Sequence, residues 1–278
     1  MRMRWLLLLL PLVPVTTAGF LLWDYMLRGP LGGLVVVIDP GHGGSDPGSH
    51  GVFGSGNDSV TIREDEYVYD VACRLKAQVE ALGGTVALTT YDLVQGCAVD
   101  GRPPNEAIPA DMNELFMLDA SPVIAGEAGL PKRTTFGNSV LTRYWWRRVV
   151  FISIHFDAIG VADLAGVHFI APEDGSREVI DDLVASFRVA GRIQKRNGEE
   201  YQPVKYSGDT SSGMRHIYVL SPKTNAIRQR VLIELGNFSN RSDVWRIRDP
   251  NVREDYARRI AAALKELNLL PVWEARNE

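Results

Sequence analysis

Residues 35–48, VVVIDPGHGGSDPG, constrain the fold of this chain more than any other stretch. Four apolar, mostly β-branched residues, Val35 to Ile38, predict a buried strand. The Asp-Pro-Gly that follows cannot continue the strand and predicts a sharp turn. His42 is therefore expected on a glycine-flanked corner at the carboxyl end of a strand, which is where open α/β sheets place ligands and chemistry.

The rest of the chain alternates between strand-like and helix-like patterns. Apolar, β-branched runs predict strands at residues 85–90, 149–155, 166–170, 216–220 and 230–235. Helical patterns occupy residues 63–82, 134–144, 176–196 and 251–268. This order predicts an α/β fold, in which a single domain has a mostly parallel twisted sheet with helices on both faces.

Changes in composition along the chain predict the boundaries of the folded domain. Residues 24–33 predict a linker, 34–270 the folded domain and 271–278 a tail. Residues 45–60, rich in Gly, Ser, Asp and Asn, predict a loop. Residues 91–131 contain five prolines and predict an irregular insertion with room for one short helix. A loop this long inside a compact domain is usually functional or mobile, which suggests a segment that folds over a cleft and gates it.

The N-terminus differs in kind from the rest of the chain. Nineteen residues from Trp5 to Trp23 carry no charge, close to the length of an apolar helix that spans a bilayer. Arg2 and Arg4 would mark the cytoplasmic side, so the body of the protein is expected in the cell envelope, outside the cytoplasmic membrane. Residues 1–23 are thus interpreted as a membrane anchor or as a cleaved signal segment, and both alternatives stay open.

Charge and cysteine content narrow the partners and the compartment. The formal net charge is −4 and no basic tract stands out, so nucleic acid is not expected as a partner. Cys73 and Cys97 are the two cysteines, and they could pair in an oxidising compartment. The sequence does not supply the distance between them, so their pairing stays open.

Polar groups stand at the ends of three predicted strands. His42 ends the first strand, His155 ends the strand at 149–155, and Glu234 lies in the strand at 230–235. Glu64 opens the first helix, whose start is expected at the same edge of the sheet. Two imidazoles and one carboxylate form the ligand set of many catalytic zinc sites, and a further carboxylate can accept a proton from water.

Five blocks of sequence resemble those of a known enzyme family. They run in order from about Val35 to Asn240: VVVIDPGHGGSDPG, EDEYVYDVACRL, RTTFGN, FISIHFDA and VLIELGNFSN. Together they resemble the zinc-dependent N-acetylmuramoyl-L-alanine amidases of the amidase-3 family. These bacterial enzymes cut the amide between the lactyl group of muramic acid and the stem peptide of peptidoglycan. The resemblance implies Zn²⁺ held by His42, Glu64 and His155, with Glu234 as the catalytic carboxylate.

Two other functions remain as alternatives: a zinc peptidase that cuts within the stem peptide, and a non-catalytic cell-wall-binding or regulatory protein. The expected partners are peptidoglycan, the membrane through residues 5–23, and a possible regulatory protein.

Several further residues receive interpretations of their own. Glu66 is the rival of Glu64 as a ligand, and Asn237 stands where the family more often has Phe, which is expected to alter the pocket floor. His168 is expected to be a partly buried strand residue, whereas His216 could line the cleft. Asp157 could orient His155 or cap a turn. Trp145 and Trp146, with the arginines after them, are expected to pack under the sheet, with a glycan-binding platform as the alternative.

Overall fold

A computed structural model describes residues 29–174 and 177–267. Its centre is a six-stranded sheet with the order β12-β9-β13-β7-β1-β4. The strands in that order are β12 (Val204–Tyr206), β9 (His168–Ala171), β13 (Gln229–Asn237), β7 (Arg148–Asp157), β1 (Leu34–Pro40) and β4 (Thr85–Leu88). Strands β13, β7, β1 and β4 are parallel, whereas β9 is antiparallel to β13. The prediction of one α/β domain with a mostly parallel sheet is confirmed.

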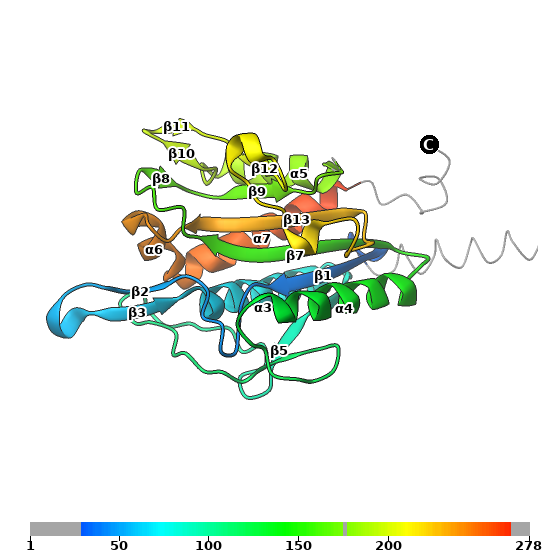
Figure 1. The fold of residues 1–278 in the computed structure, drawn as a ribbon, viewed down its shortest axis with the longest axis horizontal. Coiled ribbons are helices and arrows are strands. Elements are labelled where there is room, and N and C mark those ends of the chain that lie inside the picture. Colours follow the sequence, from blue (N-terminus) through cyan, green and yellow to red (C-terminus); the bar gives the residue numbers. More distant parts are fainter. Residues whose placement is uncertain (1–28, 175–176, 268–278) are drawn as a thin grey trace, which may run out of the picture.

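Helices cover the two faces of the sheet unequally (Figure 1). Three helices pack on one face: α3 (Glu64–Ala81), α5 (Glu178–Val189) and α7 (Pro250–Glu266). The other face is covered by α4 (Leu130–Arg143) and by residues between Met214 and Ile227. The alternation of side chains along β1 explains both layers, because Val36 and Ile38 join the first cluster while Val35 and Val37 join the second.

Short elements complete the described chain. A hairpin is formed by β2 (His50–Phe53) with β3 (Val60–Arg63), and β5 (Thr90–Asp92) pairs antiparallel with β6 (Glu114–Phe116) across a long connection. A small sheet contains β8 (Leu164–Ala165), β10 (Lys195–Arg196) and β11 (Glu199–Glu200). Helix α6 (Arg241–Ile247) follows β13, and four 3₁₀ turns are η1 (Gly56–Asp58), η2 (Glu127–Gly129), η3 (Thr210–Ser212) and η4 (Tyr218–Leu220).

Several boundaries differ from the sequence predictions. The expected loop at 45–60 contains the β2–β3 hairpin, and the expected strand at 216–220 is wrong because η4 occupies most of it. Helix α4 begins at Leu130, four residues early, because Pro131 suits the first turn of a helix. The linker prediction fails at its end, since Leu31 is fully buried and donates its N–H to the Leu82 carbonyl.

The predicted membrane or signal segment, residues 1–23, and the predicted tail, 271–278, lie outside the described residues. Within residues 29–174 and 177–267, no helix has the length and apolar character that a membrane crossing requires.

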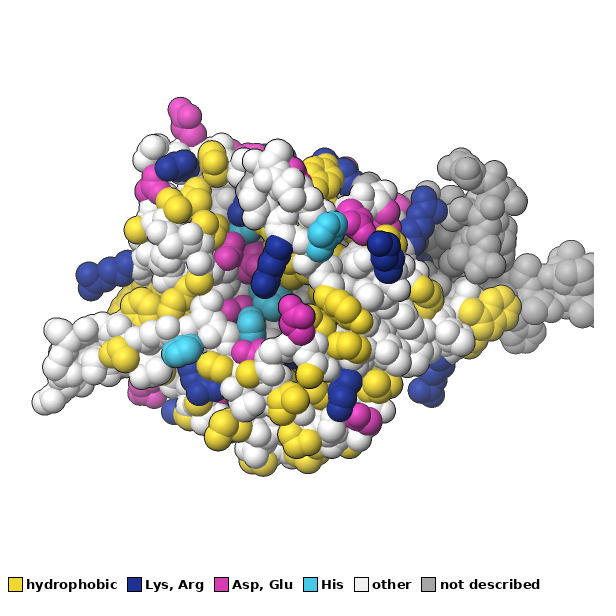
Figure 2. All heavy atoms as spheres, in the orientation of Figure 1, with side chains coloured by type: hydrophobic (Ala, Val, Ile, Leu, Met, Phe, Trp, Pro, Cys, Tyr) yellow, Lys and Arg dark blue, Asp and Glu magenta, His cyan; other side chains and the backbone are white. Residues whose placement is uncertain are grey.

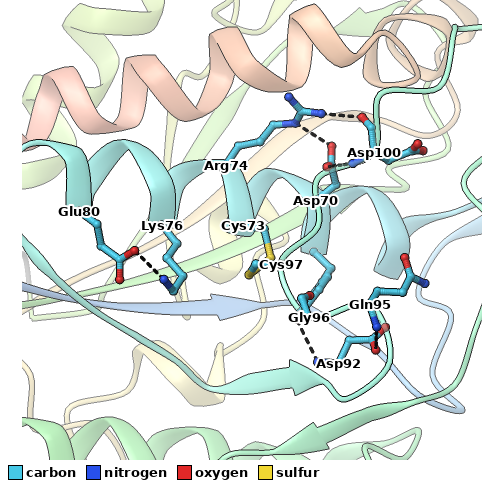
Figure 3. Close-up of a disulfide and its surroundings, with 11 residues drawn as sticks. Asp70, Cys73, Arg74, Lys76, Glu80, Asp92, Gln95, Gly96, Cys97 and Asp100 are labelled. Atoms are coloured by element: carbon cyan, nitrogen blue, oxygen red, sulfur yellow. Dashed lines mark hydrogen bonds and ion pairs between the residues drawn. A yellow bond between two sulfur atoms is a disulfide. The ribbon is translucent and has the colours of Figure 1, made fainter.

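The insertion at 91–131 is divided into two parts by its contacts. A disulfide joins Cys73 on α3 to Cys97, with a Cα–Cα distance of 5.2 Å, so the two cysteines do pair (Figure 3). Beside it, Arg74 donates to the Asp100 carbonyl at 2.6 Å, and the Asp100 N–H donates to Asp70 at 3.0 Å. The first half of the insertion is thus fastened to α3, and it contains no helix of its own. The short helix expected here is only the three-residue η2.

Candidate active site

The corner after β1 has the geometry that the sequence predicted. His42 has a φ of +64°, a left-handed conformation that is costly for a residue with a Cβ atom. Arg133 of α4 holds this corner, because its guanidinium donates to the carbonyls of Pro40 and His42 and pairs with Asp39 at 2.7 Å. The buried Asp39 carboxylate also accepts from Ser153 at 2.7 Å. This network links three segments of the chain beneath His42.

Three predicted site residues meet at the carboxyl edge of the sheet. The Oε1 atom of Glu64 lies 3.2 Å from Nε2 of His42 and 3.2 Å from Nδ1 of His155. The two imidazole centroids are 5.0 Å apart, and one possible ligand atom from each of the three residues lies within 4.8 Å of the others. Two neutral imidazoles and a carboxylate are a donor set that suits Zn²⁺.

Glycines let the three side chains approach so closely. A Cβ atom at Gly41 would stand 2.4 Å from the His155 ring, and one at Gly48 would stand 2.6 Å from the His42 ring. Side chains at these two positions would therefore occupy the space of the imidazoles.

Glu64 is fixed by the backbone around it. Its Oε2 accepts from the N–H of Ser49 at 2.8 Å, and its Oε1 accepts from the N–H of Phe156 at 2.8 Å. Glu66, the rival ligand, is turned elsewhere and accepts from the N–H of Asp111 at 2.8 Å. The structure thus brings Glu64, and not Glu66, to the two histidines.

The electrostatics of the cluster favour positive charge. Burial alone would raise the pKa of Glu64, but hydrogen bonds from His155 and His42 outweigh it and hold the pKa well below the ordinary range. Burial alone would lower the pKa of His42, but hydrogen bonds to Asp46 and Glu64 raise it to about 10. A cation bound between these groups would take the place of the proton that they attract.

Glu234 is the fourth predicted site residue. It lies opposite His155 in the register of β13 and β7, so both side chains leave the same face of the sheet. It is 8% exposed, and its Oε2 atom has no hydrogen-bond partner within the described residues. Burial, reinforced by the charges of Asp157 and Glu64, raises the pKa of Glu234 well above its ordinary value.

All four residues line one cavity of about 990 Å³. It lies on the thinly covered face of the sheet, where Figure 2 shows His, acidic and basic side chains gathered in a central hollow. The second half of the insertion forms part of its wall through Phe116, Ile124 and Glu127. His216 also lines the cavity, as the sequence suggested, and pairs with Glu173 at 3.1 Å.

Asp157 takes the second of its two expected roles, because its carboxylate caps the turn after β7 by accepting from the N–H of Ala158 at 2.7 Å. It also lies 3.4 Å from Nε2 of His168, and no hydrogen bond joins it to His155 in the described chain. Two other sequence interpretations are corrected by the structure. His168 is fully buried, not partly. Asn237 does not line the cavity floor; it is buried and donates to the carbonyls of Val161 and Leu164, which holds the loop after β7.

No pattern in the sequence points to Lys205, whose ammonium lies 3.2 Å from Nε2 of His168. It stands on β12, a three-residue strand that had not been predicted. Arg133 belongs to the RTTFGN block, but a sequence pattern does not predict its hydrogen bonds to the His42 corner.

A polar cavity at the carboxyl edge of a mostly parallel sheet is the usual place for an active site in an α/β enzyme. The comparison with known families is more specific. The model of the amidase-3 family, N-acetylmuramoyl-L-alanine amidase, matches residues 36–266, and the chain belongs to this family.

Individual relatives are more distant. The "Probable cell wall amidase LytH" of Staphylococcus aureus is 25% identical over 240 residues, which is 86% of this chain and 60% of that protein. This chain therefore spans about 60% of the length of that relative.

Solved structures share the fold. The CwlD amidase of Clostridioides difficile, solved with the GerS lipoprotein, has a TM-score of 0.55 at 22% identity and covers 84% of this chain and 97% of that one. The amidase Ami1 of Mycobacterium smegmatis has a TM-score of 0.55 at 18% identity, with 84% of this chain and 95% of that chain covered.

Proposed function

We propose that this protein is a zinc-dependent N-acetylmuramoyl-L-alanine amidase that cuts the amide between the lactyl group of muramic acid and L-alanine of the stem peptide. One observation carries the proposal: His42, Glu64 and His155 converge beside the buried Glu234 in a chain of this family. Zn²⁺ in this site would polarise the scissile carbonyl and acidify a water molecule.

The residues of the chain have distinct parts in this mechanism. His42, Glu64 and His155 would hold the metal, with the Asp46 carboxylate 3.1 Å from Nδ1 of His42, the nitrogen that faces away from Glu64. Glu234 would take a proton from the attacking water and give it to the leaving amine of L-alanine. Its raised pKa suits both steps, because a carboxyl that holds a proton more tightly is a better base before the transfer and can still act as an acid afterwards.

The disulfide supports a location outside the cytoplasm, since such bonds persist in oxidising compartments. Residues 5–23 would hold the protein at the outer face of the cytoplasmic membrane or direct its export. A regulatory partner is also proposed, because CwlD, which shares this fold, was solved in complex with a lipoprotein.

Digestion of purified sacculi by the full chain, with and without chelator, tests this function. Mass spectrometry should find intact stem peptides that begin with L-alanine, and chelator should abolish their release. Fragments cut within the stem would instead identify a peptidase. Binding to sacculi without any release, by a protein that contains no zinc, would identify a wall-binding module.

A further inference from the structure

An exposed aromatic and basic surface lies at the end of α4. We call residues 143–147 (Arg143, Tyr144, Trp145, Trp146, Arg147) the tryptophan–arginine patch. Trp145 is 66% exposed and Trp146 is 47% exposed, so the expectation that they pack under the sheet is wrong. Their ring centroids are 5.8 Å apart, and Tyr144 lies 6.1 Å from Trp146. The guanidinium groups of Arg143 and Arg147 flank the Tyr144 ring at 5.7 and 5.8 Å.

The charges of this patch are not neutralised by the protein around it. In the described part of the chain, neither Arg143 nor Arg147 forms an ion pair; Arg147 donates only to the Thr85 hydroxyl, at 3.0 Å. One exposed turn thus carries two tryptophans and two guanidiniums without an ion pair in the described chain. Large apolar side chains that gather at a surface mark an interaction site.

The patch lies at the edge of the sheet where the described chain begins. Arg148 is the register partner of Leu34, and the Thr85 that Arg147 contacts begins β4, so the patch borders the amino ends of three strands. Leu31 is bound to Leu82 at this same edge. Figure 1 shows the end of α4 and the start of β1 together at one end of the domain, with α6 at the other.

The sequence before residue 29 limits what can face this edge. Only residues 24–28 separate Trp23, the end of the uncharged segment, from Gly29. Five residues span at most about 18 Å even when fully extended. If residues 5–23 lie in a bilayer, the edge that carries the tryptophan–arginine patch is held close to the lipid headgroups.

We propose that the tryptophan–arginine patch binds the surface of an anionic bilayer. Tryptophan and tyrosine favour the headgroup level because they have an apolar body and a polar tip. Arginines beside them are attracted to the negative surface of such membranes. The patch thus matches the chemistry of a bilayer surface, whereas a glycan platform would be expected near the cavity, at the opposite edge.

Contact between the patch and the bilayer would set the orientation of the active site relative to the membrane. β7 has ten residues between the edge at Arg148 and the edge at Asp157, a length of about 30 Å. A domain that rests on its amino edge therefore holds its cavity about that far above the lipid, facing the cell wall.

Fluorescence of the full chain in lipid vesicles tests the proposal. One variant keeps Trp145 and Trp146 and replaces the other four tryptophans by Phe: Trp5→Phe, Trp23→Phe, Trp245→Phe and Trp273→Phe. The matched control keeps only Trp245, which is 58% exposed, stacks under Arg248 at 4.5 Å and lies on α6 at the opposite edge.

Vesicles that contain phosphatidylglycerol with brominated chains should quench the emission of Trp145 and Trp146 by at least about half, because side chains at headgroup depth come within reach of bromine. The Trp245 control should be nearly unaffected. Arg143→Glu, at a side chain that forms no ion pair in the described chain, should shift the quenching toward the control value. Vesicles of neutral phosphatidylcholine should have the same effect on the wild-type patch.

Two results would overturn the proposal. Equal quenching in both variants would show that the domain has no preferred orientation. Absence of quenching, with an emission that shifts to the blue as protein concentration rises, would assign the patch to contact between copies of the chain. Neither result depends on amidase activity, so the proposed function is tested separately by the digestion of sacculi.

Discussion

Glu234 on β13 stands directly opposite His155 on β7, and both side chains project from the thinly covered face of the sheet at its carboxyl edge. On its other side, Glu234 is the register partner of His168 on β9. A carboxylate buried between neighbouring strands costs free energy unless it has a hydrogen-bond partner. Within the described ranges, Oε2 of Glu234 has no such partner. The cost of burying Glu234 is consistent with a catalytic role for its carboxylate.

Removal of this carboxylate should separate catalysis from metal binding. Glu234→Ala is expected to lower turnover by several orders of magnitude and to leave zinc content unchanged, because Glu234 is not among the three grouped ligands. Release of stem peptides and metal content of the same sample are the two measurements. Wild-type turnover in this variant would rule out the proposed role, and loss of zinc would make Glu234 a ligand.

Metal removal should abolish activity reversibly. Chelator is expected to stop the release of stem peptides, and addition of Zn²⁺ should restore it, whereas His155→Ala should bind zinc at least about tenfold more weakly. His50→Ala is the matched control, since the His50 side chain is exposed on β2 and is not among the three grouped residues. Full activity of a preparation that is free of metal by elemental analysis would contradict the zinc site.

Arg133 should be needed for the shape of the His42 corner. In Arg133→Lys, a single ammonium replaces the fork that donates to Asp39, Pro40 and His42, so zinc affinity should fall about 10-fold to 100-fold. Arg143→Lys, on an exposed part of the same helix, should change neither zinc affinity nor stability by more than about 0.5 kcal/mol. Equal zinc titration curves for both variants would exclude this role.

His168 should make stability depend on pH. Burial, aided by the charge of Lys205, lowers its pKa well below 6.5, so below pH 6.5 the unfolded chain binds a proton that the folded chain does not. The free energy of unfolding should therefore fall with decreasing pH from 6.5, by at most about 1.4 kcal/mol per pH unit.

His168→Gln should lose this component of the pH dependence. Asp157, Lys205 and Glu234 also face this site, so the quantity to measure is the difference between wild type and variant in urea unfolding at several pH values. If the two proteins show parallel curves below pH 6.5, His168 does not titrate as inferred.

The disulfide should contribute to the free energy of unfolding and not to zinc binding. Cys73 and Cys97 are 24 positions apart, and a loop of this size corresponds to about 3 kcal/mol of unfolding free energy in the chain-entropy account. Cys73→Ser with Cys97→Ser should lower the free energy of unfolding by about this amount at unchanged zinc affinity. A loss of zinc affinity would show that the first half of the insertion supports the site directly.

The four site residues could be placed together from sequence because each stands at a predictable position. His42 and His155 end parallel strands, Glu234 lies near the end of a third, and Glu64 begins the helix that follows the β2–β3 hairpin. The carboxyl ends of parallel strands share one edge, so the strand pattern alone predicts that these groups meet. That they bind zinc remains a prediction.

Other features depend on information that local patterns lack. The run around His168 predicts a strand but not its direction, and β9 proves to be antiparallel to β13. Trp145 and Trp146 are apolar enough to suggest burial, yet α4 ends before them at the edge of the sheet. The partners of Arg133 lie more than ninety positions earlier in the chain, a distance over which side-chain contacts leave no periodic signal.

The division of the insertion has an evolutionary consequence. Its first half is bonded to α3, while its second half reaches the cavity as one wall. Substitutions in the wall between Phe116 and Glu127 change the lining of the cavity, while the first half keeps its disulfide to α3. Related proteins could thus differ in the shape of this cavity by varying one stretch, while the disulfide-bonded half stays the same.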